Sequence, residues 1–173
     1  MNWCENQLTV SGPQSDVHAF VHAIRGVPES WGDPDPRPEQ ALCFQNAVPI
    51  PETVVAQGYS DVGYDWCTAH WGTKWEPNLT ADVDVVDDTA ESSSVSYNFD
   101  TAWCPPDQWF VGVVAQWPTL GFQLRYAEPD TDLFGETAAD HGQVIFATRI
   151  LPSHSVWIEE HFPWVPELHA LSE

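Results

Sequence analysis

The chain has 173 residues, of which 26 are Asp or Glu and only 5 are Lys or Arg, so its formal net charge is −21 with histidine neutral. Proteins that bind nucleic acid or anionic membranes directly need clustered cations, and here the cations are scattered singly, which excludes both classes. Because 43% of the residues are hydrophobic, the chain can bury a core. It shows neither a leader pattern nor an apolar run of roughly 20 residues, so we expect a soluble intracellular protein.

The first part of the chain predicts a strand, a helix and a long loop. Residues 7–11 alternate in polarity, and apolar residues then recur at helical spacing as far as Gly26, which predicts a strand followed by a helix. Residues 27–40 are rich in proline and predict a loop. We predict a second strand over residues 41–44 and a short helix over residues 51–57.

The middle of the chain predicts an aromatic-rich helix and a hairpin. Residues 64–72 place an aromatic and apolar face at helical spacing, so we predict one or two helical turns that end at a glycine. Over residues 79–86 apolar and acidic residues alternate, which predicts a strand with one apolar and one acidic face. A turn over residues 87–93 then leads into a partner strand at residues 95–99.

The C-terminal part predicts a second long helix and two more strands. The helix begins after Pro106 and is stopped by Pro118. Alternating polarity predicts a strand over residues 122–126 and another over residues 143–150. We interpret the stretch from Gly135 to Gly142 as the turn region between them.

This order of elements predicts the α+β class. Two strand–helix–strand units that share one antiparallel sheet, with helices on one face, form a ferredoxin-like split β-α-β sandwich. The predicted domain covers residues 1–150 and includes an aromatic-rich insertion at residues 59–80. Residues 151–173 are predicted to form a C-terminal tail that packs on this domain.

Five motifs of this chain resemble one protein family. They are Asn2-Trp3-Cys4-Glu5-Asn6, Tyr64-Asp65-Trp66-Cys67, Trp71-Gly72-Thr73-Lys74-Trp75, Tyr97-Asn98-Phe99-Asp100-Thr101-Ala102-Trp103 and Phe122-Gln123-Leu124-Arg125-Tyr126-Ala127-Glu128. Over roughly residues 2–148 the chain resembles the YubB-type proteins of plasmids and phages, which have a ferredoxin-like domain and unknown function. The resemblance implies a fold, a mobile-element setting and therefore the cytoplasm of a bacterial host, but no catalytic residue.

Metal and catalytic chemistry have weak support in the sequence. His18 and His22 lie four residues apart on the first predicted helix, but two ligands do not make a zinc site. Cys67 and His70 lie three apart and could form a zinc site if the fold brings Cys4 or Cys104 near them, although no second pair of ligands has the spacing of a zinc finger. The four cysteines are widely spaced and are expected to be reduced thiols, and the negative field opposes a reactive thiolate. We therefore predict no cofactor, no metal and no catalytic residue, and expect a protein that is not an enzyme.

Acidic residues gather in two places and suggest a function in protein binding. They are Asp82, Asp84, Asp87, Asp88 and Glu91 in the predicted hairpin, and Asp130, Asp132, Glu136 and Asp140 in a later stretch. Carboxylates on a rigid sheet can imitate duplex phosphates and occupy a basic groove. We therefore expect a monomer or homodimer that binds a basic, nucleic-acid-binding host protein, as an anti-restriction or anti-CRISPR inhibitor does. An acidic surface that serves only solubility or adaptation to salt would have the same composition, rich in Asp and Glu and poor in Lys.

The aromatic segment suggests an alternative function. Its tryptophans, its histidine and the only lysine of the chain could form a pocket for a small molecule or nucleotide, used for binding or for weak catalysis. The residues concerned are Trp66, His70, Trp71, Lys74 and Trp75. The competing interpretation is that these rings form the core beneath the sheet.

Overall fold

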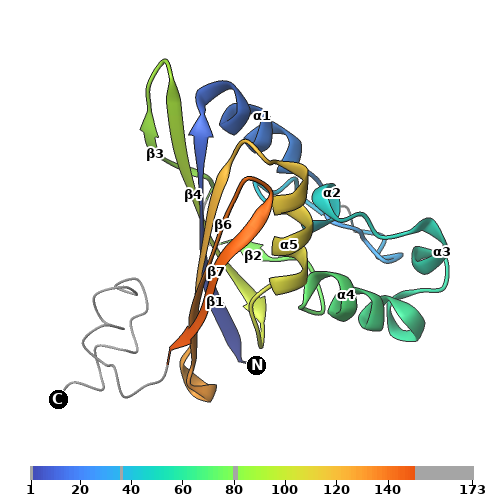
Figure 1. The fold of residues 1–173 in the computed structure, drawn as a ribbon. Coiled ribbons are helices and arrows are strands. Elements are labelled where there is room, and N and C mark those ends of the chain that lie inside the picture. Colours follow the sequence, from blue (N-terminus) through green and yellow to red (C-terminus); the bar gives the residue numbers. More distant parts are fainter. Residues whose placement is uncertain (1, 36, 80–81, 151–173) are drawn as a thin grey trace.

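A computed structural model describes residues 2–35, 37–79 and 82–150, and the predicted tail at residues 151–173 lies outside the described residues. Within them the chain forms one antiparallel sheet (Figure 1) in the order β2-β4-β1-β5-β6-β7, with β3 also paired to β4. The strands are β1 (Trp3–Pro13), β2 (Asn78–Leu79), β3 (Asp84–Asp88), β4 (Ser92–Ala102), β5 (Gly121–Glu128), β6 (Leu133–Asp140) and β7 (Gln143–Ile150).

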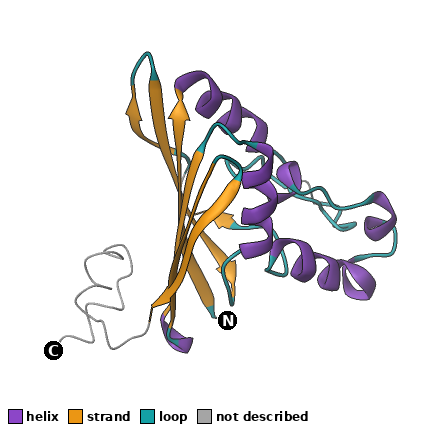
Figure 2. Cartoon of the chain, viewed as in Figure 1, coloured by secondary structure: helices purple, strands orange, loops and turns teal. Residues whose placement is uncertain are grey.

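The helices gather on one side of this sheet, as Figure 2 shows. They are α1 (Gln14–Ile24), α2 (Phe44–Ala47), α3 (Glu52–Val55), α4 (Tyr64–Trp71) and α5 (Asp107–Gln116), with a π-helical turn at Tyr59–Gly63 and a 3-10 turn at Pro129–Thr131. The other face of the sheet carries no helix among the described residues.

The connections confirm the ferredoxin-like fold. Strands β1 and β3 are both antiparallel to β4 and are therefore parallel to each other, with α1 in the connection between them. Strands β4 and β5 are both antiparallel to β1, so they are also parallel to each other, and α5 connects them. The two units interleave, because β4 and β1 lie side by side in the middle of the sheet. Strands β6 and β7 extend the sheet beyond β5.

The core lies between the sheet and the helices because the strands alternate. In β1 every second residue is buried, including Leu8 and Val10. Helix α1 buries Phe20, whose ring meets those of Tyr97 and Phe122 edge to face at centroid distances of 6.3 and 5.6 Å. Burial of one such side chain contributes about 1.5–3 kcal/mol to stability.

Three sequence-based predictions about the sheet are wrong. The predicted strand over residues 79–86 and turn over residues 87–93 are displaced, because β3 begins at Asp84 and continues to Asp88, and β4 already begins at Ser92. Residues 41–44 form no strand, because Phe44 begins α2 and stacks on Trp109 with ring centroids 4.5 Å apart; a short apolar run can be a buried loop as well as a strand. The stretch from Gly135 to Gly142 is mostly strand β6, and the turn is confined to His141 and Gly142, whose φ angles are 51° and 75°. Gly135 serves close packing instead, because a Cβ there would overlap the Tyr126 ring.

Candidate functional site

The first acidic group lies on and beside an exposed edge strand. We call the residues Asp82, Asp84, Asp87, Asp88 and Glu91 the acidic edge. Among the described residues β3 pairs only with β4, and all five of its residues are exposed. The predicted apolar face of this strand is not buried, since Val85 is 65% exposed.

A β-bulge sets the direction of two carboxylates of the acidic edge. The register between β3 and β4 shifts after Val85, so that Asp84 lies opposite Ser96 and Asp87 opposite Ser94. Because Ser94 and Ser96 are two residues apart on β4, Asp84 and Asp87 share the helix-free face of the sheet. Their backbones are about 7 Å apart along the strand.

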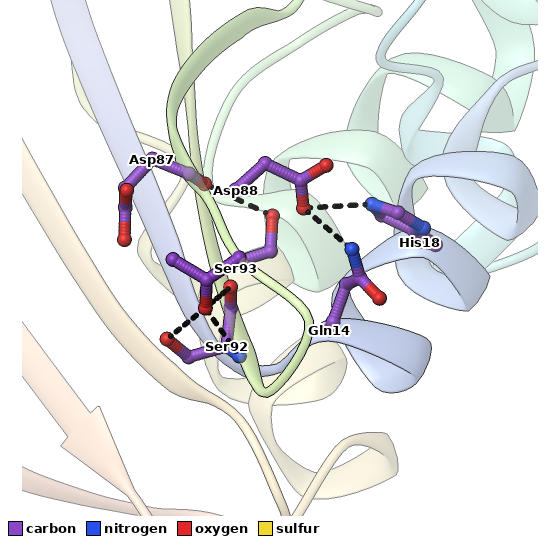
Figure 3. A network of polar contacts seen from close by, with 7 residues as sticks. Gln14, His18, Asp87, Asp88, Ser92 and Ser93 are labelled. Atoms are coloured by element: carbon purple, nitrogen blue, oxygen red, sulfur yellow. Dashed lines mark hydrogen bonds and ion pairs between the residues drawn. The ribbon is translucent and has the colours of Figure 1, made fainter.

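Asp88 points to the other side and ties the hairpin to α1 (Figure 3). One of its carboxylate oxygens accepts a 3.2 Å hydrogen bond from Gln14 Nε2 and lies 3.1 Å from His18 Nε2. The Ser93 hydroxyl donates to the backbone oxygen of Asp87 at 3.2 Å. The hydrogen bond from Gln14 is the largest cause that holds the pKa of Asp88 below its usual value, so this carboxylate stays ionised.

Arg25 is the cation that pairs with the acidic edge in the described part of the chain. Its guanidinium lies 2.8 Å from Asp82 Oδ1, and the backbone N–H of Val83 donates to the same oxygen at 2.8 Å. The Val83 N–H and then Arg25 lower the pKa of Asp82. Asp84 accepts a 3.4 Å hydrogen bond from the Asn98 amide, and no cation of the described residues forms an ion pair with it.

The second predicted acidic group does not join the acidic edge. Asp130 and Asp132 are exposed at the 3-10 turn, and Asp140 lies at the opposite end of β6. Glu136 is only 15% exposed and pairs with Arg125 at 3.3 Å. Because β4, β1 and β5 separate β3 from β6, the two groups are about 19 Å apart across the sheet.

The aromatic segment divides between core and surface. Trp71 is completely buried, and its indole N–H donates a 2.9 Å hydrogen bond to the Val48 carbonyl. Trp66 stacks on the exposed His70 with ring centroids 4.4 Å apart. The interpretation of the rings as core is therefore right for Trp71, which cannot reach a ligand without unfolding of α4.

Lys74 and Trp75 follow the end of α4, and they form a separate cluster with Trp103. The Lys74 ammonium sits 3.6 Å from the ring centroid of Trp103 and 4.3 Å from that of Trp75. This cation–π arrangement occupies one face of Trp75. Trp75 also lines a pocket together with the three residues that follow it, with Tyr59, and with three residues of the loop between α1 and α2, which the sequence analysis did not select.

The cysteines are free thiols, and burial raises the pKa of each. The Cys104 thiol donates a 2.9 Å hydrogen bond to the Gly72 carbonyl. In the parts of the chain that the structure describes, no three His, Cys, Asp or Glu side chains gather as metal ligands. No helix in those parts is long and apolar enough to cross a membrane.

These features define an acidic α+β protein with a ferredoxin-like sheet. A family model described as the ferredoxin-like domain in Api92-like protein matches residues 70–156, so the chain belongs to this family. The crystal structure of the protein api92 from Yersinia pseudotuberculosis is similar to it, with a TM-score of 0.63 over 87% of this chain and 98% of that chain. At 11% identity this likeness shows the fold alone. None of the curated proteins matches the chain.

Proposed function

We propose that this protein acts by binding a basic protein through its acidic edge. The observation that carries the proposal is the pair Asp84 and Asp87, which the bulge in β3 turns to one face of an exposed edge strand. Neither carboxylate forms an ion pair with a described residue. Two exposed carboxylates on one face of a sheet edge, without an ion pair among the described residues, suit a partner with a matching row of Lys and Arg.

The charge of the whole chain supports the same function. A net charge of −21 attracts a basic partner over a distance of about 8 Å at physiological salt, and it raises the rate of encounter. Proteins that bind nucleic acid have the strongest basic grooves, so we infer that the partner belongs to this class. The acidic edge would then occupy its groove as a nucleic-acid mimic.

The setting of this function belongs to the same proposal. The YubB-type resemblance implies a plasmid or phage and hence the cytoplasm of a bacterial host. There, an acidic protein that blocks a restriction or CRISPR protein protects the invading element. Binding of this kind needs no catalytic residue and no cofactor.

Charge reversal at the acidic edge tests the proposal. The edge variant is Asp84→Lys with Asp87→Lys, and the control variant is Asp130→Lys with Asp132→Lys, which changes the net charge equally on exposed residues elsewhere. Each tagged protein is used to capture partners from a nuclease-treated bacterial lysate, and the bound proteins are then eluted with salt. We expect the wild type and the control variant to retain the same basic protein, and a DNA duplex to displace it. Equal retention by the edge variant would overturn the proposal.

A further inference from the structure

A pocket with aromatic walls lies beside the helix layer, away from the acidic edge. Its volume is about 410 Å³, within the roughly 300–1,000 Å³ range of small-molecule sites. The aromatic walls are Trp31, Tyr59 and Trp75, which come from three separate segments. Such walls favour a flat ring, because aromatic faces and edges both pack against it.

The walls of this pocket are held in place before any ligand binds. Trp31 and Tyr59 meet edge to face with ring centroids 5.4 Å apart, and the Tyr59 hydroxyl donates a 2.8 Å hydrogen bond to the Lys74 carbonyl. Trp31 lies directly on the backbone of Gly63, where a Cβ would be 2.7 Å from its ring. Preorganised walls reduce the entropy that a ligand loses on binding.

The polar groups of the pocket indicate what else the ligand carries. Arg37 is exposed and forms no ion pair with a described residue. The side-chain oxygen of Gln40 is buried and accepts no hydrogen bond in the described structure. A ligand that brings an anion to Arg37 and an N–H donor to Gln40 would satisfy both groups.

Glu76 lines the same pocket but is already engaged. Its two carboxylate oxygens accept hydrogen bonds from the backbone N–H groups of Phe44, at 2.5 Å, and Gln45, at 2.9 Å. The Cys43 thiol lies 3.6 Å from one of these oxygens. Glu76 therefore fixes the start of α2. The Arg37 charge acts on Glu76 from a distance and helps to lower its pKa, but Arg37 forms no ion pair with it, so the guanidinium donors remain open to a ligand.

We propose that this pocket binds a small planar heteroaromatic molecule with one anionic group, such as a nucleoside monophosphate. The ring lies against Trp31 and Trp75, and the phosphate pairs with Arg37. The Gln40 amide turns toward the ligand, so that its oxygen, which has no partner in the described structure, accepts from an exocyclic N–H. Arg37 is the one Lys or Arg among the described residues that line the pocket, and it can pair with one small anion. A polynucleotide carries many phosphates, which a chain of net charge −21 repels.

Calorimetric titration of the full chain with adenosine monophosphate, adenosine and inorganic phosphate tests this inference. We expect the nucleotide to bind about tenfold or more tightly than adenosine, as a charge-assisted pair implies, and phosphate alone to bind negligibly. Arg37→Gln should make the nucleotide and adenosine bind alike, and Trp31→Ala should weaken both. Arg25→Gln and Trp66→Ala, which change an arginine and a tryptophan outside the pocket, should leave the affinities unchanged.

Two results would overturn the inference. One is the absence of heat from adenosine monophosphate with the wild-type protein. The other is an unchanged preference for the nucleotide over adenosine in Arg37→Gln, whose exposed side chain can be replaced without loss of the fold. Neither result bears on the acidic edge, since Asp84→Lys with Asp87→Lys changes no residue of the pocket.

Discussion

The indole nitrogen of Trp71 lies 2.9 Å from the carbonyl oxygen of Val48, and this hydrogen bond joins α4 to the segment that follows α2. The Trp71 ring also meets that of Phe44 edge to face, with centroids 5.8 Å apart. Trp71 is therefore part of the core of the molecule, although it stands in a segment whose composition suggested a ligand site.

Replacement of Trp71 should thus cost far more stability than replacement of its neighbour Trp66. We expect Trp71→Ala to lower the free energy of unfolding by about 3–5 kcal/mol, because it leaves a large cavity and an unpaired carbonyl. Trp66→Ala should cost about 1 kcal/mol, since Trp66 is only partly buried. Urea unfolding of the two variants measures both values, and similar losses would contradict the placement of Trp71.

The contacts of the Asp88 carboxylate with Gln14 and His18 of α1, which we call the clamp, should control the local stability of the β3–β4 hairpin. In Asp88→Asn the ionised acceptor for Gln14 and His18 is lost, so amide hydrogen exchange in β3 should become several-fold faster, with β5 and β6 unaffected. Because hydrogen bonds lower the pKa of Asp88, the clamp is complete at neutral pH and is lost only as the pH falls below the ordinary Asp value of 3.8.

Asp140→Asn is the matched control for this exchange measurement. The Asp140 carboxylate contacts the backbone N–H and the ring of His141 within its own turn, at 2.9 and 3.0 Å. Loss of this carboxylate should leave the rate of amide hydrogen exchange in β3 unchanged. Unaltered exchange in β3 of Asp88→Asn would show that the clamp does not hold the hairpin.

Glu76 should make stability fall as the pH rises from mildly acidic to neutral. Burial raises the pKa of Glu76 from its ordinary value of 4.5 to about 7, against the hydrogen bonds from Gln45 and Phe44 that lower it. Between these two values the folded state binds the proton more tightly than the unfolded chain. The free energy of unfolding should therefore decrease by up to about 3 kcal/mol as the pH rises through this interval.

Glu76→Gln isolates this contribution. The amide cannot ionise, so the pH-dependent part should disappear, although its N–H₂ group opposes one of the backbone donors and lowers stability at every pH. Denaturant unfolding at a series of pH values compares the two proteins. Parallel stability curves would show that Glu76 titrates alike in the folded and unfolded chain.

Regular alternation made much of the fold predictable from the sequence. Burial alternates over most of β1 and over the first part of β5, because one face of each strand is buried, and Pro106 marks the start of α5. Strand β6 was missed because Gly135 suggested a turn, whereas only the packed structure shows that Gly135 makes room for the Tyr126 ring.

The candidate sites were less predictable because they depend on tertiary structure. The acidic residues of the hairpin were evident, but the bulge after Val85 that brings Asp84 and Asp87 to one face has no signature in the alternating pattern. The aromatic pocket was missed because Trp31 stands in a proline-rich loop that sequence reasoning treats as a connection. Its partners, including Tyr59, come from segments that meet only when the chain folds.

The most direct test of the account is the affinity of the captured basic protein for three forms of this chain. Calorimetry at low and at moderate salt should show that Asp84→Lys with Asp87→Lys weakens binding by at least about 100-fold, with the salt dependence reduced. Asp130→Lys with Asp132→Lys should stay within about threefold of the wild type, because a general charge effect on affinity is small once salt screens it. Equal losses in both variants would mean that net charge alone, and not the acidic edge, binds the partner.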